Sequence, residues 1–250
     1  MQEIFSDRVL VLEGSSNIRD IGGYRTRDGK VTRWKTILRS ASMDKLPPES
    51  QQRLAEHGVK YIVDLRDLWE TEKSPNVFAG STLIIYHHSP VIGVDSVNKA
   101  IQETKTLVEF YTLVLEQCGP QIRAVLEVIA EQLPNGCVLF HCWAGKDRTG
   151  IVAALLLALA GVAPETIAED YGLSYALLSS QIETWRADVL QSGRNLEQFE
   201  EEVSSRPETM LATLDYLESQ LGGVESYLRS IGVSEATMEI LRTHMVEDAE

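Results

Sequence analysis

The sequence predicts an α/β protein with a mostly parallel central sheet flanked by helices and with helical additions at the C-terminal end. Short apolar segments alternate with helical patterns up to residue 163, and an almost wholly helical pattern follows over residues 164–250. Strands that alternate with helices form a parallel sheet that helices cover on both faces. No repeat or linker interrupts the pattern, so we expect a single domain over residues 1–250.

Apolar or alternating runs bounded by turn residues predict strands at 8–14, 35–40, 59–66, 81–90 and 137–142. A helix is expected after Pro47 and Pro48, with Gly58 as its stop. Two amphipathic patterns over residues 104–133 are divided at Gly119-Pro120. A helix over about 148–161 follows, and Pro164 opens the next one. Further helix breaks are expected at Ser192-Gly193, Arg206-Pro207 and Gly222-Gly223.

The charge of the chain bears on its partners. The 250 residues are 44% hydrophobic and 24% charged, with a formal net charge of −14. This balance argues against a nucleic-acid binder and against adhesion to an anionic membrane. It does not exclude an anionic substrate, because a local cluster of donors binds phosphate within an acidic protein.

Location is predicted from the termini and the cysteines. The N-terminal segment lacks the basic and apolar runs of a signal peptide, and the apolar run 151–163 is too short to span a bilayer. The three cysteines, Cys118, Cys137 and Cys142, are too few for a disulfide scaffold. We therefore expect a cytoplasmic protein, and export by a route without a cleavable signal stays open. The sequence does not indicate an oligomeric state.

The most unusual segment is HCWAGKDRTG at residues 141–150, between an apolar strand and an apolar helix. Cys142 and Arg148 are separated by five residues. A strand–loop–helix turn directs backbone N–H groups inward at a helix N-terminus, and this favours a thiolate and a bound phosphate. Arg148 adds a bidentate fork to two phosphate oxygens. We therefore expect Cys142 to attack phosphorus and form a cysteinyl-phosphate intermediate.

The residues around Cys142 suggest supporting roles. Gly145 permits a backbone torsion that bulkier residues avoid, and the hydroxyl of Thr149 is expected to donate to the sulfur of Cys142. His141 is expected to orient the loop by hydrogen bonding. A nucleotide-binding loop is a poorer interpretation, because Phe140 stands where such a loop has glycine and Asp147 replaces its Ser/Thr. A sulfur- or arsenate-handling enzyme would need a partner thiol, for which Cys137 is poorly placed.

Three segments carry a family resemblance. HCWAGKDRTG resembles the signature loop of cysteine-based protein-tyrosine phosphatases, and its Ala-Gly-Lys-Asp variant resembles atypical bacterial members that also act on phosphoinositides. NIRDIGGY at 17–24 is similar to the family's Asn-Phe-Arg-Asp-Leu-Gly-Gly motif, with Ile18 where Phe is usual. VDLRD at 63–67 is similar to its strand-end Asp-Leu-Arg. With the segment at 222–223 the resemblance spans nearly the whole chain, although only the signature loop is highly specific.

The resemblance implies a cysteine-phosphatase-like fold and hydrolysis of phosphotyrosine, with phosphoserine, phosphothreonine or phosphoinositides as further substrates. It assigns Cys142 as nucleophile and Arg148 as phosphate ligand. It implies substrate contacts from Trp143, Ala144, Gly145, Lys146, Thr149 and Gly150. For Lys146 two interpretations stay open, an extra anion contact or a solvated side chain. A phosphatase fold that binds phosphate without catalysis is the alternative function.

The general acid is harder to assign, because the Trp-Pro-Asp loop of many tyrosine phosphatases is absent. The resemblance favours Asp147, with Asp95 as the second candidate and Asp64 or Asp67 behind them. For Asp64, a carboxylate bonded to loop amides or to an arginine is the better interpretation.

The remaining expectations concern support of the site. Arg19, Asp20 and Arg66 are expected to form one ion network that braces it. Residues 93–117 are either a lid or plain helical packing. The chemistry requires no metal or other cofactor, because Arg148 and the loop amides supply the positive charge.

Overall fold

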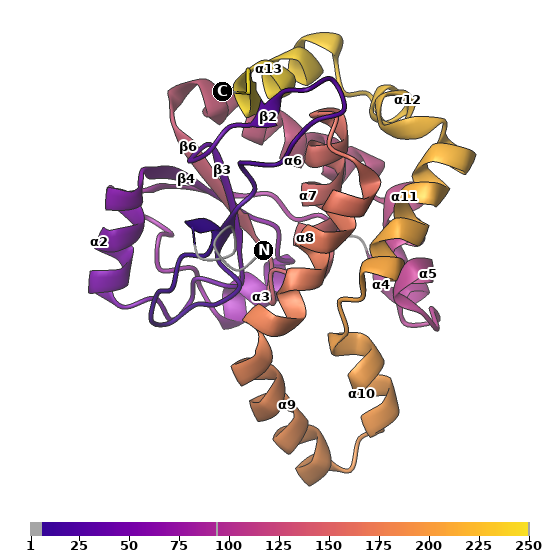
Figure 1. The fold of residues 1–250 in the computed structure, drawn as a ribbon. Helices are drawn as coiled ribbons and strands as arrows, with labels where there is room; N and C mark the ends of the chain where they lie inside the picture. The colour runs from indigo at the N-terminus through magenta and orange to yellow at the C-terminus, as the bar shows by residue number, and fades with distance from the viewer. Residues whose placement is uncertain (1–6, 94, 250) are drawn as a thin grey trace.

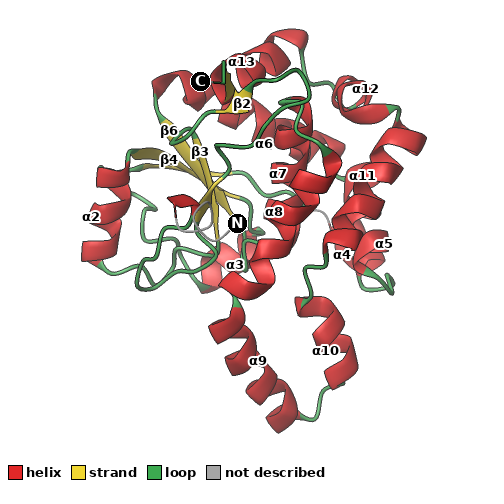
Figure 2. Ribbon diagram, viewed as in Figure 1, coloured by secondary structure: helices red, strands yellow, loops and turns green. Residues whose placement is uncertain are grey.

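The computed structural model describes residues 7–93 and 95–249, without the side chains of Asp95, Ser96 and Asn98. A central sheet runs through the molecule (Figure 2). It has five strands in the order β1-β3-β6-β4-β5. Strands β3, β6, β4 and β5 are parallel, and β1 pairs antiparallel with β3 at the edge. The strands span Arg19–Asp20 (β1), Ile37–Ser40 (β3), Val59–Asp64 (β4), Ile85–His88 (β5) and Cys137–His141 (β6). The predicted fold class is confirmed.

Helices cover both faces of this sheet (Figure 1). On one face Leu54 of α2 packs with Leu38, Ile62 and Leu139 of the strands. On the other face α6 and α7 lie against the sheet, and the core continues outward through α5, α8, α11, α12 and α13. The bounds are α2 Pro48–His57, α3 Leu68–Lys73, α4 Asp95–Ile101, α5 Leu107–Gln117, α6 Gly119–Gln132, α7 Asp147–Leu159, α8 Pro164–Leu177, α11 Pro207–Leu221, α12 Gly223–Ser230 and α13 Glu235–Met245.

Two smaller features complete the fold. Strands β2 (Val31–Thr32) and β7 (Val246–Glu247) form a separate antiparallel pair, and η1 (Leu133–Asn135) precedes β6. Helices α9 (Ser179–Ser192) and α10 (Leu196–Val203) form a hairpin that projects from the body of the molecule (Figure 1). Within the described ranges, no helix combines the length and the apolar content needed to cross a membrane.

Local sequence signals place most of the helix ends. Pro48 begins α2, and Gly58 ends it in the left-handed conformation with φ +111°, as predicted. Helix α7 is apolar on every side, and it is buried between the sheet and the outer helices. In the expected lid segment, α5 buries Tyr111, Val114 and Leu115 in the core.

The predicted strand at residues 8–14 is wrong. Only Val9 forms a bridge, to Arg19. The pairing stops because Asn17, on the segment that would continue the ladder, has a left-handed backbone with φ +55°. Residues 10–12 therefore run as coil, a turn follows at residues 13–14, and the short β1 takes the edge position beside β3.

The fold predicts that shortening a buried side chain of α7 lowers the stability of the protein. Leu156 is fully buried, so Leu156→Ala should lower the free energy of unfolding by about 2–5 kcal/mol. Leu190 on the projecting hairpin is 62% exposed, so Leu190→Ala should change the free energy of unfolding by less than about 0.5 kcal/mol. Urea unfolding measures both values. Equal losses in the two variants would contradict the assigned core.

Candidate functional site

The site lies where the carboxyl ends of the parallel strands meet. The register places Ser40 of β3 and Asp64 of β4 on either side of His141 at the end of β6. Cys142 follows directly and is 2% exposed. It lies in a hollow of about 370 Å³ lined by Trp69, Glu70, Lys73, Cys142, Trp143, Ala144, Asp147 and Arg148. The structure thus brings five of the predicted site residues together.

The loop after Cys142 is held by hydrogen bonds that other residues donate to its carbonyl oxygens. Asn17 Nδ2 donates to the oxygens of residues 144 and 145, at 3.0 Å each, and Arg39 Nη2 donates to the oxygen of residue 145 at 2.9 Å. His141 Nδ1 donates to the oxygen of residue 142, and the Ser42 N–H to that of residue 143, both at 2.9 Å. The C=O and N–H of a trans peptide point in opposite directions. The amide N–H groups of residues 143–146 therefore face away from these donors.

Two left-handed residues make this arrangement possible. Gly145 has φ +66°, and a Cβ there would lie 2.2 Å from the carbonyl oxygen of Ser40. Only glycine fits both the torsion and the contact, as the sequence predicted. Asn17 has φ +55°, which asparagine tolerates better than most residues. Neither Asn17 nor Arg39 was named by the sequence analysis, although Asn17 begins the motif at 17–24.

His141 supports the loop as a neutral group. It is fully buried, and its Nε2 lies 2.8 Å from Asn76 Nδ2. Because that amide nitrogen donates, Nε2 accepts, and the ring proton is on Nδ1, which donates to the loop. Burial lowers the pKa of His141. The ring thus fixes the loop through a hydrogen bond.

Arg148 is oriented by a carboxylate that the sequence analysis did not name. Glu70 accepts from both Arg148 Nη1 and Nη2, the latter at 2.9 Å. Glu70 also accepts from the backbone N–H of Asp67 at 2.8 Å, in a capping box at the start of α3. Burial opposes both charges, but the pairing raises the pKa of Arg148 and lowers that of Glu70. The capping-box spacing of an acid three residues after Asp67 was the available sequence signal.

The predicted single network of Arg19, Asp20 and Arg66 is wrong. Arg19 pairs with Asp170 at 2.9 Å, Arg66 pairs with Asp64 at 2.7 Å, and the carboxylate of Asp20 accepts the backbone N–H groups at positions 22 and 35, at 2.7 Å each. Arg19 and Arg66 lie on opposite sides of β6, because β1 and β4 do. Arg19 and Arg66 therefore pair with two different carboxylates.

Asp170 is the centre of the Arg19 side. This carboxylate on α8 is almost fully buried and binds Arg19, Arg39 and the hydroxyl of Tyr24. Burial alone would raise its pKa, but the two guanidinium groups hold it well below its usual range. Since Arg39 also binds the loop, Asp170 supports the site through Arg39.

The other acid candidates are accounted for in different ways. Burial opposes the charge of Asp64, yet its hydrogen bonds and ion pair with Arg66 keep its pKa below the ordinary value, which fits the arginine-bound interpretation. Asp67 caps α3 and accepts from the Gly93 N–H. Asp95 begins α4, but its side chain lies outside the described residues.

Lys146 and Asp147 point toward the helical part of the chain. Lys146 is 3% exposed, so the solvated interpretation is wrong. Its Nζ donates to the carbonyl oxygens of residues 202 and 204 and pairs with Asp147 Oδ1, at 2.8–2.9 Å. These three partners fill the capacity of an ammonium group. Lys146 does not line the hollow over Cys142, whereas Asp147 does.

The expected hydrogen bond from Thr149 to Cys142 is not made. Thr149 Oγ1 is buried and has no partner among the described residues. Gly150 lies in α7, where a Cβ would sit 3.1 Å from the ring of Tyr171. Its missing side chain leaves space for that ring.

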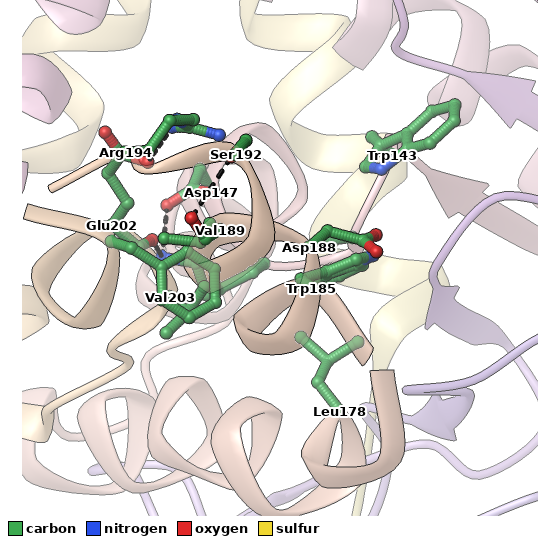
Figure 3. Close-up of a pocket in the computed structure, with 13 residues that line it drawn as sticks. Trp143, Asp147, Leu178, Trp185, Asp188, Val189, Ser192, Arg194, Glu202 and Val203 are labelled. Carbon is green, nitrogen blue, oxygen red and sulfur yellow. Dashed lines mark hydrogen bonds and ion pairs between the residues drawn. The ribbon is translucent and has the colours of Figure 1, made fainter. Parts of the chain in front are cut away.

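A second hollow lies beside the loop, under the α9–α10 hairpin (Figure 3). Its volume is about 440 Å³, and its lining includes Trp143, Lys146 and Asp147 from the loop and Trp185 and Phe199 from the hairpin. The position of the hairpin beside the loop was not predicted from the sequence. No short-range pattern connects residues 179–203 with residues 143–147.

The buried carboxylate gives a prediction about stability. Asp170→Asn should lower the free energy of unfolding by about 3–5 kcal/mol at neutral pH, because Arg19 and Arg39 would stay buried beside a neutral group. Since the folded pKa of Asp170 is depressed, its contribution is complete above the ordinary value of about 3.9 and is lost as the pH falls below it. Urea unfolding at several pH values should show the difference from wild type shrinking in acid. A difference independent of pH would contradict the assigned ion pair.

Comparison with known proteins shows the family of this chain. A model of the tyrosine phosphatase family matches residues 10–247. A tyrosine-protein phosphatase of Nostoc commune is 35% identical over 224 residues, which are 84% of this chain and 74% of that protein. The triple specificity protein phosphatase PtpB of Mycobacterium tuberculosis is 30% identical over 94% of this chain and 98% of its own length.

Among solved structures, TpbA of P. aeruginosa is similar with a TM-score of 0.41 and 15% identity over 82% of this chain and 91% of that one. The family model and the two relatives cover most of the chain, including the loop that carries Cys142 and Arg148. The chain therefore belongs to the tyrosine phosphatase family.

Proposed function

We propose that this protein hydrolyses phosphotyrosine through a cysteinyl-phosphate intermediate, with Cys142 as nucleophile, Arg148 as phosphate ligand and Asp147 as general acid. The observation that carries the proposal is that these three side chains line one hollow. The loop beside this hollow has its carbonyl oxygens bound by Asn17, Arg39 and His141 on the opposite side. N–H groups turned away from those donors supply an anion cradle.

In the first step, the thiolate of Cys142 attacks phosphorus as the bond from phosphorus to the ester oxygen breaks. Asp147 gives its proton to the departing oxygen. Arg148, held by Glu70, and the loop N–H groups stabilise the charge on the equatorial phosphoryl oxygens. The products of this step are a phenol and a phosphocysteine.

In the second step, water attacks the phosphocysteine, and the ionised Asp147 takes a proton from that water. The bond from phosphorus to sulfur breaks, inorganic phosphate leaves, and Cys142 returns to the thiolate. Every group is restored, so the cycle uses one water and no other co-reactant.

The residues at the mouth of the hollow favour an aromatic substrate. Trp69 and Trp143 line it and are 62% and 44% exposed, and Lys73 lies beside them. Exposed indole rings favour the aryl ring of phosphotyrosine. Phosphoserine, phosphothreonine and phosphoinositides are proposed as further substrates, in line with the triple specificity of the mycobacterial relative. An anion contact from Lys146 would first require its release from α10.

We propose a cytoplasmic location for this activity. The thiols Cys118, Cys137 and Cys142 are all free, which fits a reducing compartment. A reactive thiolate also depends on such an environment, because oxidation would remove the nucleophile.

The first test concerns the nucleophile. Cys142→Ser should abolish release of phosphate from p-nitrophenyl phosphate, because a hydroxyl is a far weaker nucleophile at neutral pH than a thiolate. Its unfolding curve should match wild type, and Cys137→Ser, at the far end of the same strand, should keep activity. Turnover retained by Cys142→Ser would sink the assignment.

The second test concerns the acid. Asp147→Asn should lower kcat/KM by about 10²- to 10⁴-fold for phenyl phosphate, whose leaving group needs a proton. The loss should be much smaller for aryl phosphates with acidic phenols. Steady-state kinetics on the two kinds of substrate, with Asp188→Asn on α9 as control, measures the difference. A loss of the same size for both kinds would exclude Asp147 as the acid.

A further inference from the structure

The carboxylate of Asp147 is held by one oxygen only. Tyr111 of α5 donates to Oδ1 at 2.6 Å, and Lys146 Nζ lies 2.8 Å from the same oxygen. No described residue donates to Oδ2. Asp147 itself is the first residue of α7 and lines the hollow over Cys142. The two carboxylate oxygens therefore have different surroundings.

Tyr111 is in turn held by Tyr171 of α8, with 2.6 Å between the two hydroxyl oxygens. A phenol has one proton to donate. Because Tyr111 gives its proton to the carboxylate, Tyr171 is the donor to Tyr111, and the bonds run in one direction from Tyr171 to Asp147. Burial raises the pKa of both phenols, so both remain neutral donors.

Packing fixes the position of this chain of hydroxyls. Tyr111 and Tyr171 are 0% and 1% exposed, and their rings meet edge to face, at 85° with centroids 6.0 Å apart. Gly150, one turn after Asp147, leaves the space that the Tyr171 ring fills. Tyr111 of α5 thus reaches Oδ1 of Asp147 directly, and Tyr171 of α8 reaches it only through Tyr111.

We propose that Tyr111 is a positioning residue for the general acid: with Lys146 it occupies Oδ1 of Asp147, so that the transferable proton sits on Oδ2. Protonation of Oδ1 would require a donor to turn away, which is costly in a buried site. The inference rests on the proposed function, in which Asp147 protonates the leaving oxygen. The proton passes from Oδ2 to that oxygen and returns from water in the second step, and Tyr111 keeps its own proton throughout.

The test is the dependence of kcat/KM on the leaving group. Wild type, Tyr111→Phe, Asp147→Asn and the double variant are compared on aryl phosphates whose phenols range from acidic to weakly acidic. Tyr111→Phe keeps the buried ring and removes only the hydroxyl. Tyr227→Phe is the matched control, because that buried hydroxyl also bonds to α5, at 2.8 Å from the Leu115 carbonyl oxygen, without reaching Asp147.

The kcat/KM of Tyr111→Phe should fall about 10-fold on the poorest leaving group, the upper size expected for one hydrogen bond between neutral groups, and less than about 2-fold on the best. In the Asp147→Asn background the same change should cost nothing further, because both variants impair one step. Tyr171→Phe should show the same trend more weakly, and Tyr227→Phe should match wild type.

The outcomes separate this inference from the proposed function. If the kcat/KM of Tyr111→Phe falls equally for all leaving groups, the positioning role is overturned while Asp147 remains the acid. The same holds if the fall caused by Tyr111→Phe adds fully to that caused by Asp147→Asn. If Asp147→Asn itself shows no dependence on the leaving group, the acid assignment fails and the role of Tyr111 fails with it.

Discussion

The loop at residues 142–146 is shaped by hydrogen bonds to its carbonyl oxygens, and the rest of the site depends on them. An anion cradle needs several N–H groups on one side of a short turn, and isolated peptides do not hold that arrangement. Asn17, Arg39 and His141 hold it here by binding the opposite side of the same peptide groups. Residues that never meet substrate thereby determine whether phosphate can bind.

Those donors are themselves held by buried charge. Arg39 would be unpaired without Asp170, which also binds Arg19 and so connects the N-terminal motif with α8. On the other side of β6, Asn76 fixes the neutral form of His141. Breaking one buried partner leaves an uncompensated group and costs more than the pair itself contributes. The site and the stability of the surrounding fold are therefore difficult to alter separately.

Much of the fold was predictable because its signals are short-range. The apolar run of β6, the prolines that begin α2, α8 and α11, and the glycine that ends α2 act within a few residues. The strand expected at 8–14 failed because pairing depends on the backbone of another segment, where Asn17 turns left-handed. In the site, the loop residues were predictable from their spacing. Glu70, Asp170 and Tyr111 were not, because each meets the loop from a distant part of the chain.

Residue types and their spacing were enough to predict the loop that carries Cys142 and Arg148, its place between a buried strand and a buried helix, and the need for glycine at position 145. These follow from residue type and spacing, which tertiary contacts do not change. The packing of distant helices determines that Lys146 turns toward α10, that Thr149 makes no hydrogen bond to Cys142, and that Tyr111 and Lys146 share one oxygen of Asp147. A side chain's partner depends on which distant helix packs beside it, and no local pattern encodes that neighbour.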